Sequence, residues 1–356
     1  MSKLWEKIVR PAMFALDAER AHEIGMKALE TGLASPFYGD ANAGAIGPTE
    51  RFGLRFANPV GIAAGFDKNG VAVNQLARLG FGFVEVGTVT FRPQPGNPKP
   101  RLFRLPKDQA LINRLGFNNE GAHRVAERLG KLDRKCVVGV NIGKNKDVPN
   151  EGAVENYLSC FDLVHPVADY IAVNISSPNT PNLRELQKAD SLDELLGELQ
   201  KRNSEIGRKP LLVKIAPDLS AGEIESIVGV CLTRKIDGII ATNTTIARAG
   251  LVGDDAAGCG AGGLSGRPLR SIATRVISMI YRYSNGSMPI VGVGGIFSPE
   301  DAFEKIVAGA SLVQAYTGFV YGGPSFARDL NLGLSKCVVN AGFSSLDEAV
   351  GSHVDL

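Results

Sequence analysis

The chain has 356 residues, 44% of them hydrophobic and 21% charged, which is the composition of a globular protein with room for one large domain and an appendage. Its 39 Lys and Arg residues nearly balance 37 Asp and Glu residues, so the sequence lacks the basic excess typical of nucleic-acid-binding proteins. The 5 cysteines are odd in number and widely spaced, which indicates neither a disulfide framework nor a metal site.

Residues 1–45 predict an amphipathic helical extension. Apolar side chains share one arc of its first helix, opposite Lys3, Lys7 and Arg10. The arc consists of Leu4, Trp5, Ile8, Val9, Ala12 and Leu16. Pro11 should kink or restart this helix, and Asp17 is expected to cap a second one. The apolar stripe either packs against the rest of the protein or lies in a membrane interface. We expect the N-terminus to be retained and no segment to span a membrane.

Short β-branched runs recur from residue 59 onward, and a helical pattern follows most of them. Eight segments are predicted as strands: 59–65, 83–88, 137–143, 170–176, 211–217, 238–244, 289–295 and 312–318. Nearly continuous apolar runs are typical of parallel strands covered on both faces, and eight βα units close a barrel. We therefore expect a (β/α)₈ TIM barrel over residues 46–340 and a C-terminal tail over residues 341–356. A doubly wound open sheet is the alternative, disfavoured because polar residues cluster at most strand ends rather than at one crossover.

The segment between the second and third predicted strands is too long for a plain βα loop. It contains TFRPQPGNPKPRLFRLP from Thr90 and LINRLGFNN from Leu111. Loops that follow barrel strands form the active site in this architecture, so we expect the segment to lie over the barrel mouth.

The ends of the last two strands point to a phosphate. They read GVGGI (292–296) and AYTG (315–318), where barrels commonly bind a phosphate through backbone amides, although a tightly packed strand end is the alternative. Lys68 and Lys214, at two other strand ends, need an anionic neighbour because an unpaired buried ammonium is unfavourable. A flavin or an acidic substrate supplies one, and a barrel carboxylate such as Glu85 is the alternative.

Asparagines gather at strand ends and loops, at Asn113, Asn118, Asn141, Asn174, Asn179 and Asn243. An amide offers donors and an acceptor without charge, which suits the edges of a flavin or a pyrimidine. Ser176 and Ser177 follow the fourth strand, where a serine commonly caps a turn. None of the 4 histidines lies in a strand-end motif, which disfavours a Ser/His hydrolase.

These motifs together resemble the signature segments of class 2 dihydroorotate dehydrogenases, in the family's order from about residue 58 to residue 320. The segments are AAGFDKNG, GTVTFRPQPGNPKPRLFRLP, LINRLGFNN, GVNIGKNKD, NISSPNTPNLR, VKIAPDLS, ATNTT, GGLSGRPL, GVGGI and LVQAYTGF. The N-terminal LDAERAHE resembles the start of the membrane-associated class 2 extension. Class 1 relatives lack that extension and usually carry cysteine where this chain has Ser177. The segment GDDAAGCGA after Val252 is divergent and unassigned, and Phe66 stands where leucine is common.

The resemblance implies one bound FMN and a pyrimidine substrate. The residues implied for FMN are Ala64, Gly65, Phe66, Asp67, Lys68, Thr88, Asn141, Asn174, Lys214, Thr242, Gly266, Gly295, Tyr316 and Thr317. Those implied for the pyrimidine are Lys68, Asn113, Arg114, Leu115, Gly116, Phe117, Asn174, Asn179, Asn243 and Thr244. By the same resemblance, Ser177 takes the C5 proton of dihydroorotate, hydride passes from C6 to the flavin, and Lys214 stabilises the reduced flavin.

The resemblance also implies that a membrane quinone reoxidises the flavin, in pyrimidine biosynthesis. The protein is then peripheral to the cell membrane, on its cytoplasmic side, and has no obligate protein partner. The nearest rival is a soluble relative that uses fumarate, or NAD with an iron–sulfur partner subunit. A barrel isomerase or lyase for a sugar phosphate, and a catalytically silent membrane-surface module, are the rivals from other classes.

Overall fold

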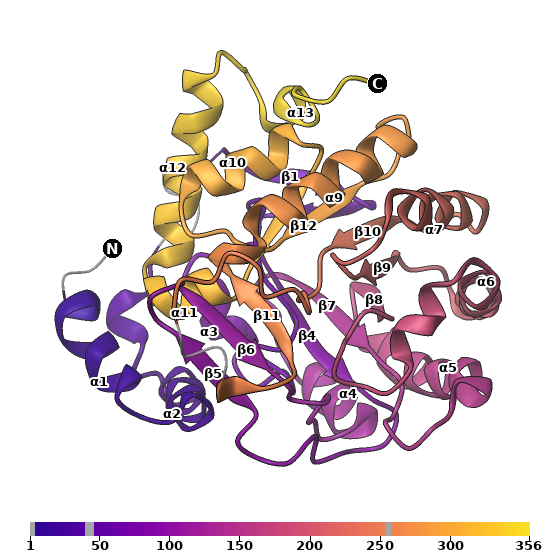
Figure 1. The fold of residues 1–356 in the computed structure, drawn as a ribbon, viewed down its shortest axis with the longest axis horizontal. Helices are drawn as coiled ribbons and strands as arrows, with labels where there is room; N and C mark the ends of the chain where they lie inside the picture. The colour runs from indigo at the N-terminus through magenta and orange to yellow at the C-terminus, as the bar shows by residue number, and fades with distance from the viewer. Residues whose placement is uncertain (1–3, 40–45, 254–257) are drawn as a thin grey trace.

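Eight strands form a closed barrel in which each strand pairs in parallel with its neighbours along the chain (Figure 1). The computed structural model describes residues 4–39, 46–253 and 258–356. The barrel strands are β3 (Val60–Ile62), β4 (Phe83–Val89), β7 (Val137–Ile142), β8 (Tyr170–Asn174), β9 (Leu211–Ile215), β10 (Gly238–Ala241), β12 (Ile290–Val293) and β13 (Leu312–Ala315). The last strand closes on the first, with Val313 opposite Val60. The TIM-barrel prediction and its eight strand segments are confirmed, and the open sheet is excluded.

Helices surround this barrel, so its strands are buried from both sides; β4, for example, is buried along its whole length. The outer helices are α3 (Val73–Arg78), α4 (Ala122–Gly130), α5 (Ala153–Val164), α6 (Ala189–Ile206), α7 (Ala221–Thr233), α9 (Arg270–Tyr283), α10 (Pro299–Val307), α11 (Thr317–Gly322), α12 (Phe326–Asn340) and α13 (Leu346–Ala349). Short 3₁₀ helices occupy Ser35–Phe37, Asn150–Gly152, His165–Val167, Leu183–Gln187 and Arg267–Leu269. Ser220 and Ser298 begin α7 and α10 with capping boxes.

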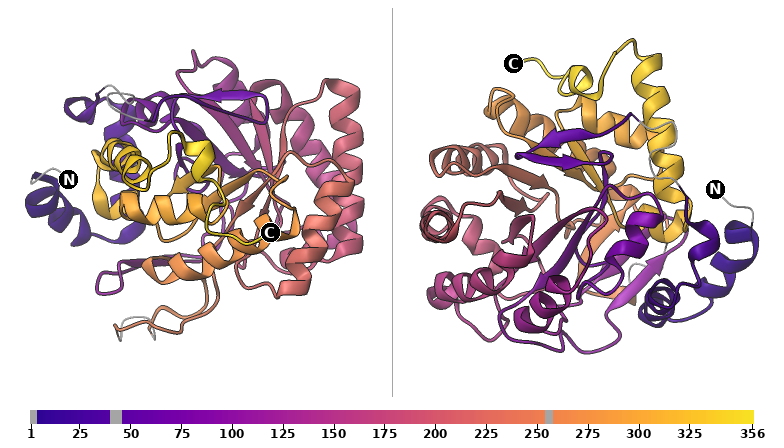
Figure 2. Two further views of the ribbon diagram at one scale, coloured as in Figure 1. Left: turned by 90° about the horizontal axis from the view of Figure 1, so that it is seen from above. Right: turned by 180° about the vertical axis from the view of Figure 1, so that it is seen from behind.

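A hairpin that the sequence analysis missed covers the N-terminal end of the barrel. It consists of β1 (Thr49–Arg51) and β2 (Leu54–Phe56). The Phe56 ring packs edge-on against Phe83 inside the barrel, with 5.2 Å between ring centroids. Figure 2 shows this hairpin at the end of the barrel opposite the loops described next. The hairpin therefore covers the end at which the barrel strands begin, where Phe83 is the first residue of β4.

The long segment after β4 lies across the other end of the barrel, as predicted. Its strands β5 (Leu102–Leu105) and β6 (Ala110–Asn113) form an antiparallel sheet with β11 (Gly263–Gly266) (Figure 1). The partner β11 comes from the loop after β10, about 150 residues further along the chain. Part of the unassigned segment after Val252 falls at 254–257, outside the described residues.

The N-terminal helices lie beside the barrel, next to β5 and α3 (Figures 1 and 2). They comprise a π-helical turn (Trp5–Val9), α1 (Arg10–Phe14) and α2 (Ala18–Glu30). Pro11 lies in the first turn of α1, and the Asp17 carboxylate accepts two backbone N–H groups of α2 at 3.0 Å, so the predicted restart and cap are confirmed. Among the residues that the structure describes, no helix is long and apolar enough to cross a membrane.

Candidate active site

A cavity opens at the C-terminal end of the barrel, between the strand ends and the β5–β6–β11 sheet. It encloses about 1070 Å³, counting the part that is open to solvent. The predicted residues that line it are Ala64, Gly65, Lys68, Thr88, Asn113, Leu115, Gly116, Phe117, Asn174, Ser177, Asn179, Lys214, Thr242, Asn243, Thr244, Gly266, Gly295, Tyr316 and Thr317. Residues from seven barrel strands or their loops thus converge on one space.

Four of the predicted site residues lie outside this lining. Phe66 faces a second cavity, where its ring meets the edge of His22 at 5.1 Å between centroids. The Asp67 carboxylate accepts the backbone N–H groups of residues 71 and 72 at 3.0 and 2.8 Å and so shapes the loop before α3. Asn141 is fully buried below the cavity, and Arg114 turns outward to the carbonyls of residues 259 and 261.

A continuous chain of hydrogen bonds connects the barrel interior to the cavity. Asn141 donates to Glu85 at 2.9 Å and accepts from the Thr88 hydroxyl at 2.6 Å. The Thr88 hydroxyl accepts from the side-chain amide of Asn174 at 2.8 Å, and the side-chain oxygen of Asn174 accepts from the Asn243 amide at 3.2 Å. Because each amide has a fixed partner, the orientation of every amide along this chain is determined.

Glu85 is the charge at the base of this chain, and it has no exposed surface. Its carboxylate accepts from Tyr170 at 3.1 Å and from Gln314 at 2.7 Å, and it lies 3.5 Å from the Lys214 ammonium. Burial and the neighbouring Glu85 charge raise the pKa of Tyr170 well above its ordinary value, so this phenol stays a donor. Lys214 therefore has the barrel carboxylate as a partner and also lines the cavity.

Lys68 is a second cation of the lining, and its neighbours come from the extension as well as from the barrel. Burial lowers the pKa of Lys68 to about 8, and the charge of Glu19 opposes this most strongly. An ammonium in such surroundings binds an anionic ligand group favourably, because the ligand supplies the charge that burial makes necessary.

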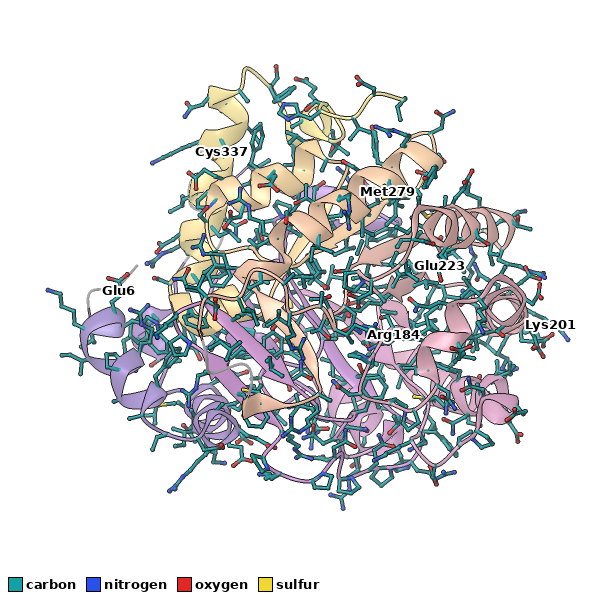
Figure 3. The ribbon with its side chains drawn as sticks, in the orientation of Figure 1. Glu6, Arg184, Lys201, Glu223, Met279 and Cys337 are labelled. Atoms are coloured by element: carbon teal, nitrogen blue, oxygen red, sulfur yellow. The ribbon has the colours of Figure 1, made fainter. Side chains whose placement is uncertain are left out.

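Ser177 lies on the loop after β8 and is 5% exposed. Its hydroxyl accepts the backbone N–H of Asn179 at 3.2 Å, and the Asn179 amide donates to Asn113 at 3.1 Å. Arg184, labelled in Figure 3, holds this loop from behind by donating to the carbonyls of Ser176 and Thr244 at 3.1 and 3.0 Å. The loop that carries Ser177 and the loop after β10 are thus tied together.

The ends of β12 and β13 form a narrow backbone cradle. A side chain at Gly295 would place its Cβ 2.4 Å from the Arg270 Cα, so only glycine lets the chain pass here. The first N–H groups of α11 have no acceptor within the helix, which leaves them for a ligand. Ser265, which the sequence analysis did not single out, contacts the Thr317 hydroxyl at 2.8 Å beside this cradle. Within the part of the chain that the structure describes, the buried amide oxygens of Asn118 and Gln314 have no hydrogen-bond partner, and both residues line the same cavity.

A second cavity, of about 1260 Å³ with its open part, lies between the N-terminal helices and the barrel. Its walls are almost entirely apolar, and it shares Leu102, Leu111 and Tyr316 with the first cavity. Two basic side chains face it. Burial lowers the pKa of His22 to about 3, so this imidazole is neutral, and Arg104 stacks on the Phe14 ring at 4.8 Å.

Fold and site define a (β/α)₈-barrel enzyme with a narrow backbone cradle at the ends of β12 and β13, a polar cavity at the barrel mouth and an apolar side cavity. The chain belongs to the dihydroorotate dehydrogenase family, whose model matches residues 48–338.

Similar proteins cover nearly the whole chain. A dihydroorotate dehydrogenase (quinone) from Roseiflexus sp. (strain RS-1) is 50% identical over 355 residues, 98% of each chain. One from Vibrio parahaemolyticus serotype O3:K6 (strain RIMD 2210633) is 51% identical over 332 residues, 91% of this chain and 98% of the relative. The ligand-free structure of an Eimeria tenella enzyme of this family has a TM-score of 0.90 at 40% identity, covering 96% of this chain and 100% of that one.

Proposed function

We propose that the protein oxidises (S)-dihydroorotate to orotate with bound FMN and passes the electrons to a quinone, in the biosynthesis of pyrimidines and UMP. The observation that carries this proposal is the pair of adjoining cavities, one polar and one apolar, which share Leu102, Leu111 and Tyr316. A polar substrate that arrives from water needs a polar cavity, whereas an apolar electron acceptor needs an apolar one. The near full-length relatives carry the name dihydroorotate dehydrogenase (quinone), which agrees with this assignment.

The residues of the barrel mouth fit FMN. The cradle around Gly295 and Thr317 offers backbone N–H groups to a phosphate, and the unpartnered amide oxygens of Asn118 and Gln314 offer acceptors. The other proposed FMN residues are those named from the resemblance. When bound, FMN supplies a two-electron acceptor for hydride. The Lys214 ammonium, held beside Glu85, adds the positive charge that favours electron acceptance there.

The substrate side is made of amides, one serine and one ammonium. Asn113, Asn179 and Asn243 have fixed orientations and can hydrogen-bond a pyrimidine edge. Ser177 is proposed as the base that takes the C5 proton while hydride leaves C6. Lys68 supplies a charge for the substrate carboxylate. The remaining pyrimidine residues, including Leu115 to Phe117, close over this space from the long segment after β4.

The apolar cavity is proposed as the quinone site. Ile24 and Leu33 line it and are also exposed, so they mark its outer opening. The predicted apolar arc divides here: Trp5 and Val9 line the cavity, whereas Leu4 and Ile8 are 51% and 63% exposed.

We propose that the exposed half of this arc lies in the bilayer surface, with the protein peripheral on the cytoplasmic side of the cell membrane. Lys7 and Arg10 then lie near anionic headgroups, while Lys3 lies outside the described residues. Residues 1–45 form the membrane and quinone unit, residues 46–340 the FMN barrel and residues 341–356 a tail. We propose that the protein acts without an obligate protein partner.

The test begins with the purified protein, which should be yellow with one FMN per chain. Dihydroorotate should bleach the flavin without oxygen, and a short-chain quinone should restore the colour, whereas fumarate or NAD should not. A colourless protein that cannot be reconstituted with FMN would refute the proposal. Restoration by fumarate or NAD alone would move the chain to the soluble branch of the family.

A further inference from the structure

A buried ion pair joins the N-terminal helices to the strand that begins the sheet over the barrel mouth. Glu19 lies in the first turn of α2, and Arg101 directly precedes β5; Figure 1 shows these elements side by side. Arg101 Nε lies 3.2 and 3.1 Å from the two Glu19 oxygens, and Nη2 lies 2.7 Å from Oε1. Both side chains are 8% exposed, unlike the surface pair Lys27–Glu30 on the same helix.

The same guanidinium also holds the segment that carries the proposed pyrimidine residues. Its Nη1 atom donates to the carbonyls of Pro95 and Asn97 at 2.6 and 2.8 Å. Asn97 donates its backbone N–H to the Leu115 carbonyl at 3.0 Å and its amide to the Arg114 carbonyl at 2.9 Å. Leu115 lines the cavity. A short series of hydrogen bonds therefore runs from the extension to the cavity wall.

The backbone around the Arg101 guanidinium is closely packed. Gly96, with φ of +80°, lies so close that an added Cβ would be 2.3 Å from the Leu115 carbonyl and 2.7 Å from Arg101 Nη1. The Asn97 side chain also donates to the Asn179 carbonyl at 3.3 Å, in the loop that carries Ser177. A displacement of the guanidinium must therefore move the backbone around it.

A buried ion pair is an unusual way to dock a helix that otherwise rests on apolar contacts and on the exposed Lys99. Burying two charges removes both from water, and apolar side chains of similar volume often dock as well or better. What the guanidinium adds is direction, because its N–H groups lie in one rigid plane. Here the Glu19 carboxylate accepts from Nε and Nη2 along one edge of the guanidinium, and the carbonyls of residues 95 and 97 accept from Nη1.

Glu19 acts on the cavity by a second route. Burial lowers the pKa of Lys68 to about 8, and among the surrounding charges Glu19 does most to oppose this. Glu19 thus supports the charge of a lining residue in addition to fixing Arg101.

We propose that Glu19 and Arg101 are positioning residues for dihydroorotate, through which the helical extension holds the loop over the pyrimidine in its binding geometry. The inference rests on the proposed function, since it takes residues 113–117 as the pyrimidine loop. It gives the extension a task on the substrate side, separate from that of the apolar cavity.

The experiment compares Glu19→Gln and Arg101→Lys with the wild-type holoenzyme. The orotate Kd is read from the change in the flavin spectrum, the limiting rate of flavin reduction by dihydroorotate is measured without oxygen or quinone, and Tm is recorded. Both variants should raise the orotate Kd about tenfold, the scale of one or two lost orienting hydrogen bonds. The limiting rate should stay within about threefold of wild type, because Ser177 is untouched.

The matched control is Glu23→Gln, the same change one turn further along α2, where the carboxylate pairs with exposed Lys99. Its orotate Kd should stay close to that of wild type, because Glu23 is the weakest of the acidic neighbours that support the Lys68 charge. A docking role alone predicts a lower Tm and slower quinone reduction with an unchanged orotate Kd, and this result overturns the proposal. If Glu19→Gln does not fold, Arg101→Lys keeps the charge and decides the question in the same way. A wild type that dihydroorotate cannot bleach refutes the proposed function itself, whereas a bleached wild type with unchanged variants refutes only the positioning role.

Discussion

The two cavities share a wall but are built in opposite ways. At the barrel mouth, polar side chains orient one another, as in the series Glu85, Asn141, Thr88 and Asn174. In the side cavity the walls are apolar, and His22 is neutral because burial lowers its pKa to about 3. The first space selects a ligand by hydrogen-bond pattern and charge, and the second by hydrophobicity and length. The two half-reactions should therefore respond to different mutations.

The substitution Ser177→Ala should produce the largest difference between the two half-reactions. Loss of a general base slows proton transfer about 10²- to 10⁴-fold, so flavin reduction by dihydroorotate should fall by that amount. FMN content and reoxidation by quinone should be unchanged. Single-turnover mixing without oxygen measures both halves, with Ser204→Ala on the exposed face of α6 as the control. Reduction near the wild-type rate would place the base elsewhere.

Deletion of the first 40 or so residues should have the next largest effect, on the other half-reaction. Losing one wall of the apolar cavity removes contacts worth about 2–3 kcal/mol, so reoxidation by quinone should slow by roughly a hundredfold. Liposome association should also fall. Saturating dihydroorotate should still bleach the flavin, although a higher concentration is needed if Glu19 positions the pyrimidine loop.

Unchanged quinone kinetics in the truncated enzyme would refute the role of the extension. A parallel loss of both half-reactions and of FMN would show instead that the N-terminal helices mainly hold the barrel together.

A single substitution should distinguish the role of the membrane-facing surface from that of the cavity, with a smaller effect. Ile8 is 63% exposed and does not line the cavity, so Ile8→Glu should weaken liposome binding about tenfold, the effect expected from partial loss of one large apolar side chain. Reduction of a water-soluble quinone should be unaffected. Val339→Glu, equally exposed on α12, is the control and should bind liposomes like wild type. Liposome binding by the Ile8→Glu variant at the wild-type level would contradict the proposed orientation of the extension on the bilayer.

The smallest effect should be a pH dependence at the polar site. Burial and Arg101 lower the pKa of Lys68 to about 8, while Glu19, Asp67 and Glu23 act in the opposite direction. His22 is also close, but it stays neutral. Lys68 is protonated below its pKa, so orotate affinity should be constant up to about pH 7 and decline as the pH rises through 8. Titrations of the flavin spectrum with orotate measure this, and Lys68→Met should bind weakly at every pH.

The sequence predicts the barrel because each of its strands is a short apolar run that a helix follows. The Asp17 cap and the restart at Pro11 are equally local signals, and both are confirmed. The β1–β2 hairpin was missed because its strands have three residues each and no alternating pattern. The pairing of β11 with β6 has no local signal at all, since the partners are about 150 residues apart.

Site residues could be gathered from motifs, but the direction of their side chains could not. Phe66 and Asp67 are adjacent to lining residues, yet one ring faces the side cavity and one carboxylate turns to the backbone before α3. Gln314 carried a usable signal that was overlooked, because an amide in the middle of an apolar strand needs polar partners. The connection from Glu19 through Arg101 to residue 115 depends on tertiary packing alone.

The wall formed by Leu102, Leu111 and Tyr316 has a kinetic and a pharmacological consequence. If the side cavity holds the quinone, electrons pass between two cavities that share these side chains, and the two substrates never meet. Orotate can leave before or after the quinone arrives, and double-reciprocal plots should give the parallel lines of a ping-pong enzyme. An apolar inhibitor that fills the side cavity should then compete with quinone alone, and accumulated dihydroorotate should be unable to displace it.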